Sequence, residues 1–479
     1  TGVQTCALPI SSKEVQKKLA DAKVNGSAVF GLDVKLPGLL YASVAMCPVM
    51  GGELASSNAE AVAAMKGVKK VIALQADRSG TPDAVAVVAD SRWHAMQAVR
   101  KLELGWDPGA HARLDSNAVV QALDDAVDTE QGHVYHSTGD VGALKGVKVV
   151  DAEYRAPFVA HAAMEPVNCT AQFTDGRVKL WVPTQAPSIV VAAAARVAGV
   201  SAEQIDLHVT LLGGGFGRRL ESDMVVQAVQ LARELGGAPV QLMWRREDDI
   251  RHDFYRPASV ARLSGMLDER GQLVGLRSHS ASGAAGQALM QRAFGLPKAG
   301  PDKTTCEGLF DHPYEVPHQQ ISHVIVDTPV PLGPWRSVGH SHNAFFKESF
   351  IDELAQAAGK DPYQFRRPLL EGTKDLAVLD AAAKAIGWDK PLAKGMHRGH
   401  CGIGQQGLQN ATTDQTAGTG EQHLACGAQS VAPAASACSR LACAAATLGA
   451  AVSHPCKCRS ARSASAPIHS GLSFRQGMY

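Results

Sequence analysis

The sequence predicts an α+β fold, and three observations support this prediction. Apolar and polar residues alternate in several short stretches, with the period of two that half-buried strands show. Other stretches place their apolar residues on one face of a helix, as in residues 220–235. A glycine cluster at 213–217 separates an apolar run from that helix. No internal repeat is found, so we expect mixed helices and sheets without a repeat architecture.

The elements are expected in the following order. Residues 28–107 alternate between strand and helix patterns and predict one compact α+β unit. A polar stretch follows near 123–140, and strands resume at 147–154 and in 177–187. Then come a helix at 188–198, a strand at 206–212, the glycine cluster, a hairpin that turns at 268–271, a strand from 318, and a helical end to 334–370.

The amino-acid composition limits the classes of molecule that this protein is expected to bind. The 479 residues hold 47 Lys and Arg against 46 Asp and Glu, a net charge of +1, without a run of five basic residues. We therefore expect a small molecule or a protein as partner, with no nucleic acid and no anionic membrane. The sequence contains no run of 18 apolar residues, so no membrane span is predicted. Its first thirty residues lack a secretion pattern. We expect a soluble chain, although a missing true N-terminus leaves an export signal open.

Both ends differ from the rest of the chain. Residues 1–24 start without Met and read as non-native or linker sequence. Residues 399–479 hold six of the ten cysteines and none of the six tryptophans, and they show no strand or helix period. We expect an out-of-frame or disordered tail there. A metal-binding tail is the alternative, but its His and Cys spacing matches no zinc site, so no metal ligands are predicted.

The glycine cluster carries the main functional signal. It lies between a strand pattern at 207–211 and the helix pattern at 220–235. Such a turn exposes backbone N–H groups near the positive end of a helix, and glycine lets an anion approach closely. Arg218 and Arg219 would add cationic donors. A phosphate-bearing cofactor is predicted. The dinucleotide-binding fingerprint G-x-G-x-x-G is not matched, because its third glycine is missing here. The structural alternative is a tight turn whose glycines only allow the helix and the strand to pack closely.

Four motifs together resemble a known family. They are GGGFGRR (213–219), HAAMEPVNCTAQ (161–172), WVPTQAP (181–187) and PWRSVGHSHNAFFKESFIDELA (334–355). The set is similar to the molybdopterin-binding large subunit of the xanthine dehydrogenase and aldehyde oxidase family, and most similar to the isoquinoline 1-oxidoreductase beta subunits within it. The resemblance covers about residues 25–398. It implies a hammerhead α/β domain at 25–110, a first molybdopterin-binding domain at 130–375, and the start of a second such domain at 376–398, truncated or out of frame.

The resemblance implies a molybdenum hydroxylase. Such enzymes hold molybdenum on molybdopterin, often as the cytosine dinucleotide, and oxidise an N-heteroaromatic or aldehyde substrate with water as the oxygen source. The few early cysteines cannot form the four-cysteine sets of iron-sulfur clusters, so a small iron-sulfur subunit is the implied partner. This chain would then be an inactive fragment of that enzyme. A non-catalytic cofactor-binding or scaffold relative is the alternative.

Site residues follow from the matched motifs. The resemblance assigns cofactor binding to Gly213, Gly214, Gly215, Phe216, Gly217 and Arg218. It assigns catalysis to Arg336 of PWRSVG, where a planar cation would stabilise negative charge that develops on the substrate.

The motifs also depart from the family pattern. Arg218 and Arg219 replace a Gly-Lys pair, and Leu220 stands where a glutamate follows that pair, which puts purine recognition in doubt. Val159 stands where a glutamine is expected, so His161 and Glu165 are left out of the predicted site. The family's general base is a glutamate in a Gly-x-Gly-Glu sequence. Glu421 in GTGE imitates it, but its flanks show no strand pattern, and we expect it to be a decoy.

Overall fold

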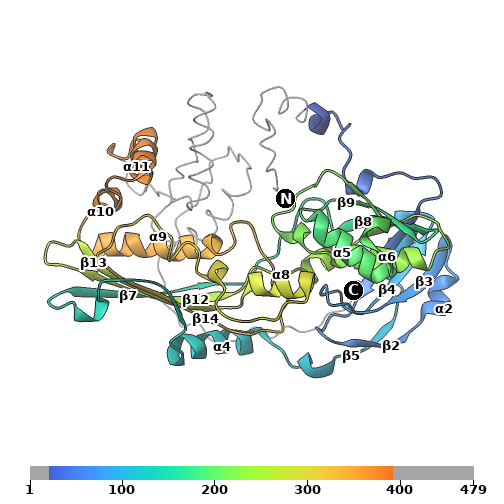
Figure 1. Ribbon diagram of the computed structural model, residues 1–479, viewed down its shortest axis with the longest axis horizontal. Coiled ribbons are helices and arrows are strands. Elements are labelled where there is room, and N and C mark those ends of the chain that lie inside the picture. The colour runs from blue at the N-terminus through green and yellow to red at the C-terminus, as the bar shows by residue number, and fades with distance from the viewer. Residues whose placement is uncertain (1–20, 392–479) are drawn as a thin grey trace, which may run out of the picture. The chain divides into compact units, whose positions relative to one another are not determined.

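The computed structural model describes residues 21–391, and its helices and strands confirm the predicted mixed fold (Figure 1). One mixed sheet has seven strands, which in spatial order are β10 (Ile205–Val209), β9 (Arg177–Val182), β8 (Asn168–Thr174), β11 (Val240–Met243), β1 (Leu40–Met46), β4 (Ala84–Ala89) and β3 (Val68–Leu74). A second sheet has five, which are β6 (His133–Thr138), β14 (His318–Ile325), β13 (Leu273–Ser282), β12 (Ser259–Leu267) and β7 (Lys148–Ala156). A two-stranded sheet pairs β2 (Glu53–Ser57) with β5 (Leu104–Asp107).

The seven-stranded sheet is covered on both faces. Strand β4 reads AVAVVA and is buried at every position, the pattern of a strand between two layers. Successive side chains of a strand point to opposite faces. Ala86 accordingly joins the core cluster beneath α6 (Asp223–Arg233), whereas Val87 joins a separate cluster with Val99 of α3 (Arg92–Val99). Helix α5 (Pro187–Ala198) packs beside α6, and α2 (Ala59–Ala63) packs on β3.

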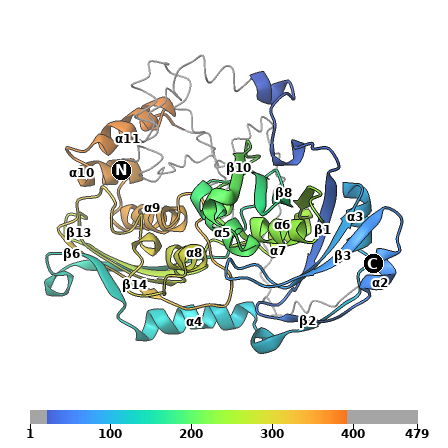
Figure 2. The same cartoon turned by 45° about the vertical axis from the view of Figure 1, so that its right-hand side comes forward.

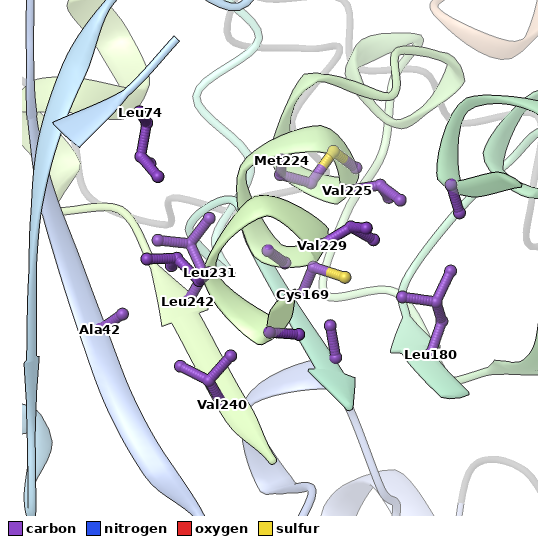
Figure 3. Packing of buried hydrophobic residues seen from close by; sticks show 14 of the residues in the cluster. Ala42, Leu74, Cys169, Leu180, Met224, Val225, Val229, Leu231, Val240 and Leu242 are labelled. Atoms are coloured by element: carbon purple, nitrogen blue, oxygen red, sulfur yellow. The ribbon is translucent and has the colours of Figure 1, made fainter. Parts of the chain in front are cut away.

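The larger core lies between α6 and the sheet (Figure 3). Met224, Val229 and Leu231 are completely buried on α6. Cys169 of β8 and Leu242 of β11 are buried beneath them. Burial of aliphatic side chains stabilises by roughly 1.5–3 kcal/mol each, so this contact fixes the start of α6 against the sheet.

The five-stranded sheet also has a helix on each face (Figures 1 and 2). Leu263 of β12 joins the cluster that contains Phe346 and Phe350 of α9 (His340–Ala357). Val260, three positions earlier in β12, joins the cluster with Val127 of α4 (Ser116–Thr129) on the other face. Helices α10 (Pro362–Leu369) and α11 (Lys374–Ala385) extend the α9 cluster. The remaining α-helices of the described part are α7 (Arg246–Arg251) and α8 (Ala285–Phe294), and none of the helices in 21–391 is long and apolar enough to cross a membrane.

Several expectations can be compared with the observed elements. The hairpin is confirmed: β12 and β13 pair antiparallel, and the amide of Gly271 donates to the carbonyl of Asp268. The stretch read as polar contains α4 and β6. The seven-stranded sheet takes β1, β3 and β4 from the 25–110 range and β8 to β11 from the 130–375 range. Leu40 pairs with Val240 across that predicted boundary, because a buried sheet can join strands that are distant in the sequence.

A buried histidine makes the stability of this fold depend on pH. His323 lies between Ser280 and Ser282, with its Nδ1 2.8 Å and its Nε2 3.2 Å from their hydroxyl oxygens. Burial lowers the pKa of His323 from 6.5 to about 3. Between these pH values the unfolded chain binds a proton that the folded chain does not. The free energy of unfolding should therefore fall as the pH drops from 6.5 to 3, by up to about 1.4 kcal/mol per pH unit.

Urea unfolding between pH 7 and pH 4 measures this slope. We expect His323→Gln to have a shallower slope than the unchanged protein, and exposed His133→Gln to leave it unchanged. Equal slopes in the two variants would contradict a role for His323.

Candidate functional site

The glycine loop connects β10 to the short 3-10 turn η5 (Arg218–Leu220) that precedes α6. Its backbone is left-handed at Gly214 (φ +103°), Phe216 (φ +55°) and Gly217 (φ +108°). Within residues 21–391, no group accepts a hydrogen bond from the amides of Gly214, Gly215 or Phe216. Successive amides in such a conformation form a concave site for an anion or another electronegative ligand. Helix α6 itself begins at Asp223, later than the predicted start at Leu220, because η5 intervenes.

Close contacts explain why glycines occupy this loop. A Cβ on Gly213 would lie 2.3 Å from the Cβ of Glu165. A Cβ on Gly217 would lie 1.6 Å from the carbonyl oxygen of Pro334. Both distances are far below van der Waals contact, so only glycine fits. The loop is therefore held directly against the HAAMEP and PWRSVG segments.

Gln185 of WVPTQAP supports the loop from a third side. Its Oε1 accepts a hydrogen bond of 3.1 Å from the amide of Gly217. The backbone amide of Gln185 donates to the carbonyl of Arg219 at 2.9 Å. A Cβ on Gly215 would lie 2.6 Å from the same Oε1 atom. All four motifs that the sequence singled out thus meet at one place.

Glu165 is a buried anchor for the loop. Its carboxylate accepts from the amide of Gly213 at 3.0 Å and from the amide of Leu32 at 3.1 Å. It also forms an ion pair of 3.2 Å with Arg219, whose Nε donates to the carbonyl of Gly214 at 3.0 Å. A buried charge needs such a partner. Arg219 is therefore a structural support of the loop.

Arg218 requires a correction, because the sequence suggested a cationic donor to the cofactor. The side chain is 2% exposed and forms a bidentate ion pair with Asp223, with N–O distances of 3.0 and 2.7 Å. Its Nε also lies 3.1 Å from Asp253. Burial acts to lower the pKa of Arg218, but the two carboxylates raise it above its usual value. Its charge is thus neutralised within the protein, and it holds η5 to the start of α6.

His161 links the loop to the segment that carries Arg336. Its Nδ1 lies 2.9 Å from the Asp253 carboxylate and its Nε2 lies 3.0 Å from the carbonyl oxygen of Pro334. Both ring nitrogens of His161 thus face oxygen atoms, and the ring joins Asp253 to the Pro334 segment. Asp253 also pairs with Arg218, so one carboxylate contacts both residues.

Backbone strain is concentrated at this site. Five non-glycine residues in the described range have positive φ, and the four outside the β8–β9 turn are Ala162, Phe216, Ser337 and Val338. Each such conformation costs on the order of 1–3 kcal/mol and persists only where the surroundings impose it. Strain of this kind is typical of binding and catalytic segments. Arg336 is exposed next to two of these residues.

Glu221 has a partner that the sequence did not reveal. Its carboxylate forms two hydrogen bonds with Arg292 of α8, of 3.0 and 2.6 Å, and the guanidinium of Arg292 lies 4.2 Å from the ring centroid of Phe254. This carboxylate is committed to an ion pair. The doubt about purine recognition that Leu220 raised remains untested.

Sequence reasoning left out several residues of this site. His161 and Glu165 were excluded because a neighbouring glutamine was missing, and Asp253 and Arg292 were not considered. The HAAMEP match was the available signal for the first two. The other two could be found only from the tertiary structure, since no motif marks them. Glu421 lies outside the described residues.

The glycine loop offers hydrogen-bond donors to a ligand. Residues 21–391 contain no group of three or more His, Cys, Asp or Glu side chains that could hold a metal ion. The unpaired amides at 214–216, with the partly exposed ring of Phe216 beside them, instead fit the oxygen atoms of a ligand that approaches the loop. These residues fit a pterin-type cofactor that carries its own metal.

The fold is α+β, and four separate sequence motifs meet at its glycine loop. Residues 126–369 match the molybdopterin cofactor-binding domain. The chain belongs to this family. It is 29% identical over 394 residues to the beta subunit of isoquinoline 1-oxidoreductase from Brevundimonas diminuta, a match that covers 80% of this chain and 49% of that protein. The chain thus spans about half the length of this relative.

Two further comparisons agree. The molybdenum-binding subunit of an aldehyde oxidoreductase from Escherichia coli is 27% identical over 285 residues, which are 58% of this chain and 36% of that protein. The crystal structure of quinoline 2-oxidoreductase from Pseudomonas putida 86 superimposes with a TM-score of 0.58 at 19% identity, over 78% of this chain and 53% of that chain. The second comparison supports the fold.

Proposed function

We propose that this chain is the molybdopterin-binding part of a molybdenum hydroxylase that oxidises an N-heteroaromatic or aldehyde substrate with water as the oxygen source. The observation that carries the proposal is the assembly of four distant motifs around three unpaired amides at 214–216. Family membership and the relatives' names support the class of cofactor and of substrate. The sequence ranges 25–110 and 130–375 remain our proposal for the two domains.

The residues of this chain would act by binding and positioning. The bound cofactor supplies the two-electron redox chemistry at its molybdenum. Gly213, Gly214, Gly215 and Gly217 let the loop pack closely against the neighbouring segments, and the amides of Gly214 to Phe216 would donate hydrogen bonds to the oxygen atoms of the cofactor. The Phe216 ring, 37% exposed, would bound the substrate side. Arg336 would stabilise negative charge that develops on the substrate.

Two finer points belong to the same proposal. The cofactor is expected in its cytosine dinucleotide form. Electrons are expected to leave through a small iron-sulfur subunit, because Cys47, Cys169 and Cys306 of the described part are single buried cysteines and cannot supply a cluster's four thiolates.

Replacing Gly215 with Val tests cofactor binding. A side chain there displaces Gln185, whose Oε1 would lie 2.6 Å from the new Cβ and which accepts a hydrogen bond from the amide of Gly217, so the loop should lose its observed conformation. In a full-length version of the protein, expressed beside a small iron-sulfur subunit and a cofactor-loading chaperone, we expect bound molybdenum to fall at least tenfold by mass spectrometry. Circular dichroism checks that the variant is folded.

Gly199→Ala is the matched control, because Gly199 ends α5 and a Cβ there meets nothing within 4 Å. It should keep the molybdenum content of the unchanged chain. Full occupancy in a folded Gly215→Val protein would reject the cofactor role of the loop. Bound molybdenum without dye reduction by N-heterocycles or aldehydes would instead favour a non-catalytic relative.

A further inference from the structure

A small cavity with several polar lining residues borders the Arg336 segment, residues 334–339. Its volume of about 10 Å³ is room for a single water-sized occupant. Six of its lining residues carry the argument, and they are Arg256, Ser282, Thr304, Thr305, Trp335 and His342. The cavity is too small for a pterin or a nucleotide, and none of its lining residues belongs to the glycine loop 213–217.

Arg256 brings an unbalanced charge to this cavity. Four arginines are buried within residues 21–391, and three of them have a carboxylate oxygen within 3.2 Å: Arg218, Arg219 and Arg366. Arg256 forms no ion pair with any described residue. Its terminal nitrogens donate to the hydroxyl of Ser341 at 3.0 Å and to the carbonyl of Pro157 at 2.9 Å, while its Nε has no acceptor in the described part. Burial lowers the pKa of Arg256 to about 10, as expected for an uncompensated cation.

His342 adds a second unsatisfied donor. Its side chain is 4% exposed and lines the cavity, and neither ring nitrogen has a hydrogen-bond partner among residues 21–391. The hydroxyls of Thr304 and Thr305 donate to Asp302, so they are already in use. Asp302 itself accepts from Thr304 and from the amide of Gln287 and forms no ion pair with Arg256. Buried polar groups normally have partners, which points to an occupant of the cavity.

We propose that this cavity binds one monoatomic anion of chloride's size between Arg256 and His342. A water molecule could accept from either donor but would leave the guanidinium charge unbalanced. An anion would accept hydrogen bonds from both side chains and would also balance the guanidinium charge. Sulfate or phosphate would be too large for the space. The guanidinium of Arg256 lies 5.9 Å from the ring centroid of Trp335, and Val338 lines the cavity. The anion therefore stabilises the strained segment that presents Arg336.

Thermal unfolding of the full chain in different sodium salts tests this proposal. At matched ionic strength, chloride and bromide should raise Tm in a saturable way, by about 2–4 °C over gluconate, since a ligand that binds only the folded state stabilises it. Sulfate should give no such saturable rise. Arg256→Gln should abolish the chloride effect. Arg277→Gln, which changes an exposed arginine on β13, should keep it.

Bromide-soaked crystals give a second measurement that needs no variant, in case Arg256→Gln does not fold. An anomalous bromide peak between Arg256 and His342 is expected. Equal Tm values in all four salts, or crystals in which the cavity holds water and no bromide, would overturn the proposal.

Discussion

Gly217→Ala should lower the free energy of unfolding by about 2–5 kcal/mol, a large effect for the addition of one methyl group. The new Cβ would lie 1.6 Å from the carbonyl oxygen of Pro334, and the backbone at Gly217 has a φ of +108° that L-residues rarely adopt. Neither the loop nor the 334–339 segment can move alone, because His161 bonds to that same carbonyl at 3.0 Å. Urea unfolding of the full chain measures the loss.

Gly199→Ala separates the two causes of this loss. Gly199 has a φ of +71°, but a Cβ there meets nothing within 4 Å, so this variant adds backbone strain without a clash. It should cost only about 1 kcal/mol. If the two variants lost equal stability, the close approach of the glycine loop to Pro334 would not be a determinant of this fold.

Local sequence patterns predicted the elements that are determined by interactions between residues close in the sequence. The hairpin at 268–271 and the helix at 188–198 were correct, because turn residues and a helical apolar face act over a few positions. The stretch near 123–140 was read as polar, yet α4 and β6 lie in it, since burial of one apolar stripe on the sheet stabilises α4. The pairing of β1 with β11 joins residues 200 positions apart, as Leu40 with Val240, and no local signal marks it.

The site was predictable as a set of motifs but not as a set of contacts. Similarity located the glycine loop and Arg336 within the matched residues 126–369, and their roles toward cofactor and substrate stay predictions. Charge alone suggested that Arg218 faces the cofactor. The structure gives it Asp223 and Asp253 as partners instead, and Asp253 is 35 positions away in the sequence. Which carboxylates lie beside Arg218 is decided by the tertiary fold, and no local sequence pattern marks them.

The placement of Arg336 is fixed by its neighbours on both sides. Pro334 accepts from His161, and the indole of Trp335 donates to the carbonyl of Ala160 at 3.4 Å. After Arg336, Ser337 and Val338 are held at positive φ, and the amide of Val338 donates to the carbonyl of Trp335 at 2.6 Å. A backbone held this firmly presents the exposed side chain with little loss of entropy when substrate binds.

Arg336→Lys should therefore lower kcat/KM by on the order of ten to a thousandfold in a full-length, cofactor-loaded version of the enzyme, while the bound molybdenum stays unchanged. The ammonium keeps the charge but loses the planar pair of donors that a guanidinium offers to charge developing on a substrate oxygen or nitrogen. Dye reduction with N-heterocycles and aldehydes measures turnover, and mass spectrometry measures the metal. Arg277→Lys, on exposed β13, is the matched control and should keep full activity. Unchanged turnover in Arg336→Lys would mean that this arginine has only a structural or surface role. A parallel loss of bound molybdenum would mean that it contributes to cofactor binding instead of acting on the substrate.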